Sequence, residues 1–167
     1  MSDLEAIRLV DKHGGQGVFV DTNLLLLSLI GQLSPELVTR FKRTRMFEVK
    51  DFVLLQSFLK KFVKIIATPG ILTEVNGLAN QLEGRLKPAF LQLFRSQIAL
   101  FDERPVTSKV ASEHPCFERF GLTDAAIRIL SAEQMLVLTD DFALSGYLTS
   151  EGIDCINFNH IRYVSPS

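Results

Sequence analysis

The stretch of this chain best suited to chemistry is an apolar run that stops at three polar residues. The β-favouring run Val18–Val20 is followed directly by Asp21, Thr22 and Asn23. A second apolar run, Leu24–Ile30, begins at once and favours a buried helix. A buried strand that ends in polar groups and leads into a buried helix is a common way for an α/β domain to build a site.

Four further carboxylates are expected at the same edge of a sheet as Asp21. In a parallel sheet all strands end at one edge, and the helices that follow or precede those strands begin there. Glu74 lies in the second turn of the helix after the second expected strand, and Asp124 begins the helix before the fourth. Asp140 and Asp141 come directly after that fourth strand. Five carboxylates are therefore placed at the edge where open α/β sheets bind ligands.

A group of ionised carboxylates is costly unless a cation neutralises it. Carboxylate oxygens suit Mg²⁺ or Mn²⁺, and no set of Cys and His residues with zinc spacing competes. Two such ions can bracket a phosphodiester, one activating water and the other stabilising the leaving oxygen. Thr22, Asn23 and Thr139 are then candidates to hold a carboxylate or a metal-bound water by hydrogen bonds.

Each acid also has an ordinary structural interpretation. Asp124 could simply complement the positive end of a helix, and Asp140 or Asp141 could be an N-cap. Glu74 could be a solvated helix residue. Asp21 is the hardest to explain in this way, so the metal-site hypothesis depends on the joint placement of the acids.

The elements expected to position these acids alternate along the chain. This alternation favours an α/β fold, a parallel sheet with helices on both faces. We expect a single domain over 1–167, with helical elaborations at about 34–63 and 84–120. The expected strands are 17–20, 64–67, 101–106, 135–138 and 153–158, and the expected helices are 1–13, 22–31, 34–45, 50–62, 69–78, 84–100, 125–133 and 140–150, with a connector at 109–120.

Composition and charge bound the class of protein. Apolar residues make up 47% and charged residues 22% of the 167 residues, which are ordinary values for a globular chain. The net charge of −1 argues against a molecule that binds nucleic acid with its whole surface. The apolar run 24–30 is too short to span a membrane, and the first 15 residues are too mixed for a signal peptide. We therefore expect a cytoplasmic protein without a membrane partner.

The densest basic cluster is a candidate contact surface for an RNA backbone. Its alternative interpretation is a solvated helix end whose cations favour the negative end of the dipole. The cluster consists of Arg40, Lys42, Arg43 and Arg45.

Taken in order, four short motifs resemble the PIN-domain ribonuclease family. They are Val18-Phe19-Val20-Asp21-Thr22-Asn23, Thr68-Pro69 leading to Glu74-Val75, Leu122-Thr123-Asp124-Ala125-Ala126-Ile127, and Val137-Leu138-Thr139-Asp140-Asp141-Phe142. The resemblance covers about Gly17 to Arg162. It implies a three-layer α/β/α sandwich with a central parallel sheet, and a Mg²⁺- or Mn²⁺-dependent nuclease that acts on single-stranded RNA.

The resemblance also implies roles for particular residues. Asp21, Glu74 and Asp124 match the first three acidic positions of the family. The pattern Thr-x-Asp selects Asp141 as the fourth, with Asp140 beside it as a further metal ligand. Many bacterial members are toxins paired with a small antitoxin-like protein. Independently of the resemblance, the apolar face of the expected helix 84–100 either packs on its own sheet or holds a second subunit, so a homodimer is a further expected assembly. This chain is longer than those toxins, which weakens the toxin assignment but not the nuclease chemistry.

Three hypotheses remain open at this point. The first is a metal-dependent endoribonuclease that cleaves single-stranded RNA by in-line attack of water. The alternative is a non-catalytic RNA- or protein-binding module on the same fold. A phosphatase of the haloacid dehalogenase type also begins with an Asp at a strand end, but it needs a second Asp where this chain has Asn23.

Overall fold

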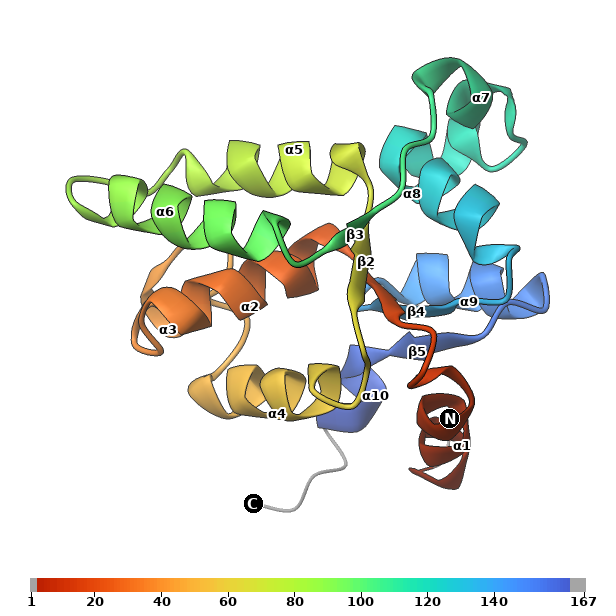
Figure 1. The fold of residues 1–167 in the computed structure, drawn as a ribbon, viewed down its shortest axis with the longest axis horizontal. Coiled ribbons are helices and arrows are strands. Elements are labelled where there is room, and N and C mark those ends of the chain that lie inside the picture. The colour runs from red at the N-terminus through yellow and green to blue at the C-terminus, as the bar shows by residue number, and fades with distance from the viewer. Residues whose placement is uncertain (1–2, 163–167) are drawn as a thin grey trace.

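The computed structural model describes residues 3–162, and it shows an α/β fold with a five-stranded parallel sheet between layers of helices. Figure 1 shows the strands at the centre, with helices on either side. The strands are β1 (Val18–Val20), β2 (Ile65–Ala67), β3 (Asp102–Glu103), β4 (Leu136–Thr139) and β5 (Cys155–Asn157). The helices are α1 (Asp3–His13), α2 (Thr22–Leu33), α3 (Leu37–Arg40), α4 (Val49–Leu59), α5 (Pro69–Ala79), α6 (Leu86–Ile98), α7 (Ser108–Glu113), α8 (Phe117–Ser131), α9 (Phe142–Ser150) and α10 (Phe158–Arg162).

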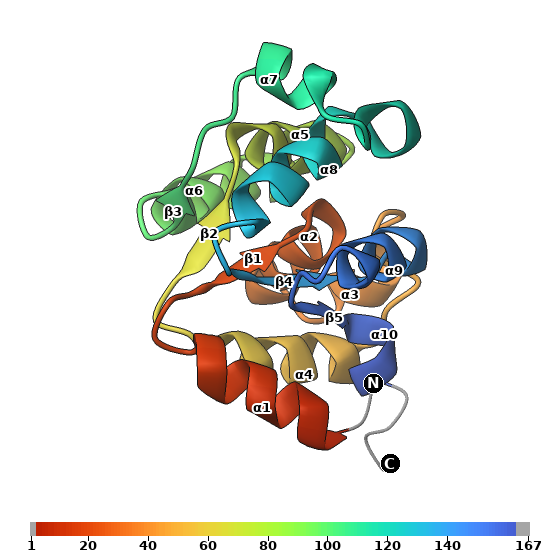
Figure 2. The same cartoon turned by 90° about the vertical axis from the view of Figure 1, so that its right-hand side faces the viewer.

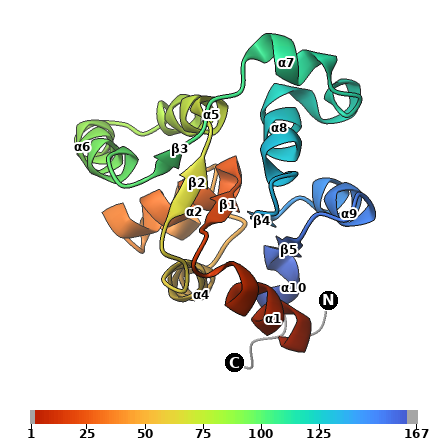
Figure 3. The same ribbon diagram turned by 45° about the vertical axis from the view of Figure 1, so that its right-hand side comes forward.

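The order of the strands in the sheet is β3-β2-β1-β4-β5, and every pairing is parallel. The chain moves from β1 outward to β2 and β3, then crosses to β4 and moves outward to β5. Right-handed crossovers in opposite directions place their helices on opposite faces of a sheet. Figure 3 accordingly shows α2, α4, α5 and α6 on one side of the strands and α8 and α9 on the other. The expected three-layer α/β/α arrangement is therefore confirmed.

The core is built around β1 and α2. All three residues of β1 are fully buried, and so are Leu24–Leu27 on the following helix. A helix that is apolar on every side must be covered on every side, and α2 packs against α3, α4, α5 and α6. Gly31 allows a close contact with α4, because a Cβ there would lie 2.2 Å from the ring of Phe52. The rigid unit of β1 and α2 fixes Asp21 between them.

The helix α1 lies beside α10 (Figure 2). Its last residue, His13, is fully buried, and its Nε2 atom lies 2.6 Å from Oδ2 of Asp154. Lys12 makes an ion pair of the same length with that carboxylate. The expected helix at 1–13 is present over 3–13, while residues 1 and 2 lie outside the described residues. These contacts join the helix to the residue that precedes β5.

The structure corrects the sequence-based elements in two places. The expected helix 34–45 is only one turn long, because the backbone N–H of Ser34 bonds to Ile30 and ends α2, and Phe41 is extended. The expected connector 109–120 instead contains a helix, α7, whose N-terminus is capped by the side chain of Thr107.

The ends of other elements also differ from the prediction. The last strand ends at Asn157, and α10 follows it within the expected range of the strand. The helix α8 is broken at Gly121, where φ is 82° and ψ is −175°. Its second segment therefore begins at Leu122, close to the expected start of the helix at Ala125. No described helix is both long and apolar enough to cross a membrane.

Candidate active site

Asp21 lies at the point where the direction of the sheet connections reverses. The backbone N–H of Asp21 donates to the carbonyl oxygen of Leu138 at the end of β4, so β1 and β4 finish side by side. Open α/β sheets bind ligands at the carboxyl ends of the strands at such a reversal. Asp21 from β1 and Asp140 from the end of β4 meet at that position.

Both oxygens of the Asp21 carboxyl are held by backbone donors. Oδ1 accepts the N–H of Leu24 at 3.0 Å and so caps α2, while Oδ2 accepts the N–H of Asp140 at 3.0 Å. Only 8% of the residue is exposed. The site therefore contains a carboxyl that is fixed in place by two different segments of the chain.

The surroundings of Asp21 disfavour its negative charge. Burial, and then repulsion from Asp140, raise its pKa to about 8, although hydrogen bonds from Thr139 and from the two backbone donors act in the opposite direction. A nearby cation would remove this cost, because it stabilises the ionised form. A cation at this position would therefore lower the pKa of Asp21 and stabilise its ionised carboxylate.

Glu74 is held by two hydroxyl groups from different elements. The hydroxyl of Thr22 donates to Oε2 at 2.7 Å, and the hydroxyl of Thr123 donates to Oε1. These bonds connect the starts of α2 and of the second segment of α8 to the second turn of α5. Thr22 was expected to hold a carboxylate, whereas Thr123 had no assigned role.

Asp124 belongs to the same group of acids as Glu74. Burial raises the pKa of Asp124 to about 6, and the nearby charges of Asp141 and Glu74 act in the same direction. Four segments of the chain therefore bring carboxylates to one edge of the sheet, in the arrangement expected from the order of the elements.

The neighbouring residues Asp140 and Asp141 face different partners. Oδ1 of Asp140 accepts a hydrogen bond from the side-chain amide of Asn23 at 3.2 Å. Asp140 also lies close enough to Asp21 for its charge to raise the pKa of Asp21. Oδ1 of Asp141 accepts the N–H groups of Ala143 and Leu144 and caps α9.

Asp141 thus has two roles in the site. It caps a helix, as one of the sequence interpretations held, and it also influences Asp124 through its charge. The hydroxyl of Thr139 accepts the backbone N–H of Asp141 and so helps to fix the turn that carries both acids. The acids consequently form two subgroups, one of Asp21 with Asp140 and one of Glu74 and Asp124 with Asp141.

A polar contact at the end of β5 was not predicted. The side-chain amide of Asn159 donates to the backbone oxygen of Asp140 at 2.7 Å. The backbone N–H of Asn159 donates to the side-chain oxygen of Asn157. Both asparagines are buried. The signal was available in the sequence, because Asn157 ends the fifth strand at the same edge as the acids and Asn159 follows it by two residues.

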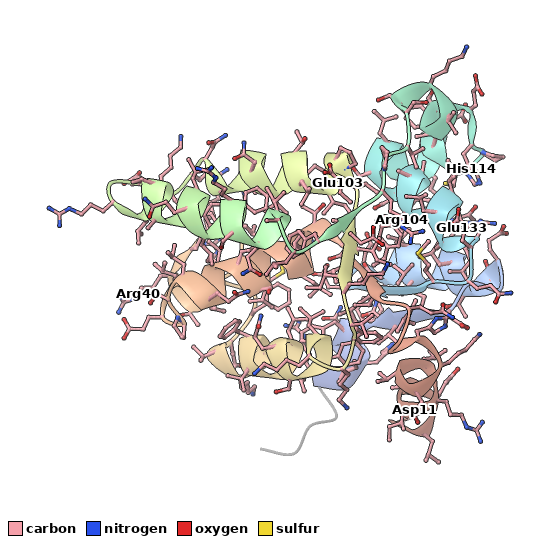
Figure 4. The ribbon with its side chains drawn as sticks, viewed as in Figure 1. Asp11, Arg40, Glu103, Arg104, His114 and Glu133 are labelled. Carbon is pink, nitrogen blue, oxygen red and sulfur yellow. The ribbon has the colours of Figure 1, made fainter. Side chains whose placement is uncertain are left out.

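The basic cluster lies away from this edge. It follows α2 at the end opposite to Asp21, and a helix of that length separates its ends by roughly 18 Å. Figure 4 shows Arg40 at the far end of the molecule from α8. Arg40 pairs with Glu36, and Arg43 donates to Gln81. Lys42 and Arg45 are exposed in the same segment. The structure therefore does not bring these four residues to the acids, and RNA contact by them stays a prediction.

Carboxylate oxygens such as those of these acids are the ligand type that Mg²⁺ and Mn²⁺ take. Among residues 3–162, no three Asp, Glu, His or Cys side chains lie close enough together to hold a metal ion. Mg²⁺ retains several waters and is commonly bound through one or two carboxylates, so a pair of these acids would be sufficient. The raised pKa values of Asp21 and Asp124 supply the electrostatic reason for a cation.

No protein-family model matches this chain, and no curated protein matches it.

Proposed function

We propose that this protein is a metal-dependent endoribonuclease of the PIN-domain type that hydrolyses phosphodiester bonds in single-stranded RNA. The observation that carries the proposal is the meeting of Asp21, Glu74, Asp124, Asp140 and Asp141 at the reversal point of the sheet. Repulsion between the acids and burial favour a dication there.

The residues of the chain have separable tasks in this mechanism. Bound Mg²⁺ or Mn²⁺ would supply the activation of water and the neutralisation of charge on the phosphate. Asp21 with Asp140 would hold one cation, and one or two of Glu74, Asp124 and Asp141 would hold the other, with waters as the remaining ligands. Backbone N–H groups fix the carboxyl of Asp21, so it needs little rearrangement to bind.

Three other side chains keep the ligands in place. Thr22 and Thr123 fix the orientation of Glu74, and Asn23 fixes Asp140. Groups that orient metal ligands by hydrogen bonds typically change metal affinity or activity by 10- to 100-fold when removed. We infer that these three residues support the reaction without touching the RNA.

The decisive experiment compares RNA cleavage by the wild-type protein and by Asp21→Asn in the presence of Mn²⁺. We expect the substitution to reduce the rate at least about a hundredfold, since it removes a metal ligand. Asp11→Asn is a matched control, because it makes the same chemical change on α1, distant from α8 in Figure 4. Equal rates for wild type and Asp21→Asn would refute the proposal.

The same experiment separates the two classes of function. Binding of RNA by both proteins without cleavage by either would support the non-catalytic binding module. A small antitoxin-like protein stays a prediction from the resemblance. Cytoplasmic location and a homodimer stay predictions from the sequence pattern.

A further inference from the structure

A cavity of about 410 Å³ lies directly beside the acids. It opens between the first turns of α5, the helix α7 and the second segment of α8. Glu74 and Thr123 line it, and these are the same two residues that are hydrogen-bonded to each other in the candidate active site. The cavity and the acid cluster are therefore one continuous surface.

The lining of this cavity matches an uncharged ring better than a phosphate. Pro69, Val106 and Leu122 form apolar walls from three different segments. Glu74 is the only charged residue among the described lining residues, and its carboxylate would repel a phosphate group placed inside. An unstacked base, in contrast, binds well against apolar walls with a few polar groups at their edges.

Two hydroxyl groups supply such polar edges. Thr73 on α5 and Ser108 at the start of α7 both line the cavity and are exposed. The described residues offer neither hydroxyl a hydrogen-bond partner. Each is free to bond to a base edge or to the ribose 2′-hydroxyl, the group that distinguishes RNA from DNA.

The fold explains why the cavity exists. Gly121 interrupts α8 with a positive φ of 82°, a conformation that favours glycine. The segment before the break turns aside to pack with α7, and Leu122, Thr123 and Asp124 begin the following segment at the acids. Figure 3 shows α7 and the first part of α8 set apart from α5, with the chain from β3 passing between them.

We propose that this cavity binds one base and its ribose from the single-stranded RNA substrate, next to the phosphate at the acids. The proposal rests on the proposed function and specifies which part of the protein holds the substrate. It predicts that the cavity contributes to affinity and to the preference for RNA, independently of the acids that carry the chemistry.

The test fills the cavity by Ser108→Phe and uses Ser112→Phe as a matched control. Ser112 lies on the same helix and is exposed, but it does not line the cavity. Both variants also carry Asp21→Asn to prevent cleavage. Affinity is measured by fluorescence anisotropy with a labelled RNA of about twelve nucleotides and with DNA of the same sequence.

We expect Ser108→Phe to weaken RNA binding by about tenfold or more, since each base held by a protein contributes affinity of that order. Ser112→Phe should stay within about twofold of the parent. Thr73→Phe fills the same cavity from α5, so it should weaken RNA binding as Ser108→Phe does. A loss in both variants cannot be explained by a distortion of α7 alone. The parent, which carries Asp21→Asn alone, should bind the DNA more weakly than the RNA.

Unchanged RNA affinity in both Ser108→Phe and Thr73→Phe would overturn the inference, as would equal losses in Ser112→Phe. These outcomes differ from failure of the proposed function. If wild type cleaves RNA with Mn²⁺ and Asp21→Asn does not, the nuclease proposal holds even where the cavity variants bind normally. Absence of RNA binding by the parent would overturn the cavity assignment.

Discussion

Replacing Asp21 with Asn should remove a loss of stability that the wild-type protein undergoes between pH 6 and pH 8 without divalent cations. Burial and the charge of Asp140 raise the pKa of Asp21 from 3.8 to about 8 in the folded chain. The folded state therefore keeps a proton that the unfolded state has already lost in this range. Because the folded state binds more protons, the free energy of unfolding falls as the pH rises.

The magnitude follows from these two pKa values. Between pH 6 and pH 8 the linkage relation gives a decrease of about 2 kcal/mol in the free energy of unfolding. Asp124 acts in the same direction, but with a pKa of about 6 it contributes mainly below this range. Asp124→Asn should consequently reduce the fall in the free energy of unfolding below pH 6. It should leave most of the fall between pH 6 and pH 8 unchanged.

The assay is urea unfolding followed by circular dichroism at several pH values, with EDTA present. Circular dichroism suits this chain because it contains no tryptophan. Ionisation of the histidines is common to wild type and variant, so it cancels in the difference between their profiles. Parallel profiles for wild type and Asp21→Asn from pH 6 to pH 8 would refute the reasoning, and Asp11→Asn should follow wild type.

Three other predictions concern packing, capping and orientation. Gly31→Ala should lower the free energy of unfolding by about 1–3 kcal/mol, measured in urea, because the new Cβ would meet Phe52; unchanged stability would contradict that contact. Asp141→Ala should cost about 1 kcal/mol by removing the cap of α9, whereas Asp141→Asn, which keeps an amide oxygen, should cost less in the same assay. Thr123→Val should reduce RNA cleavage about tenfold without moving the unfolding midpoint, since it releases one oxygen of Glu74; full activity would show that this bond does not orient the acid.

The positions of the acids could be predicted because each is tied to a local pattern. Asp21 ends a run that is apolar enough to be a buried strand, and Thr68-Pro69 marks the start of the helix that carries Glu74. Parallel topology then brings the carboxyl ends together without any further information. The alternation of strand and helix patterns likewise favours the α/β class from the sequence alone.

The contacts between side chains could not be predicted in the same way. Thr123 and Glu74 are 49 residues apart, and nothing local in either segment specifies that they meet. The expected helix at 34–45 had a good start signal at Ser34, but the chain uses that residue to end the previous helix. A capping residue indicates a helix boundary, and tertiary packing decides which side of it is helical.

The position of β1 at the centre of the sheet has a consequence for how the chain folds. Val18 pairs with Ile65 on one side and with Leu136 on the other, so the second pairing joins residues 118 positions apart. Contacts of such long sequence separation slow folding. During synthesis the entirely apolar strand β1 is exposed on one side until β4 has been made. In that interval it can associate with other chains. The acids are divided between the same two parts of the chain, so a nascent protein holds no assembled acid cluster until β4 has docked.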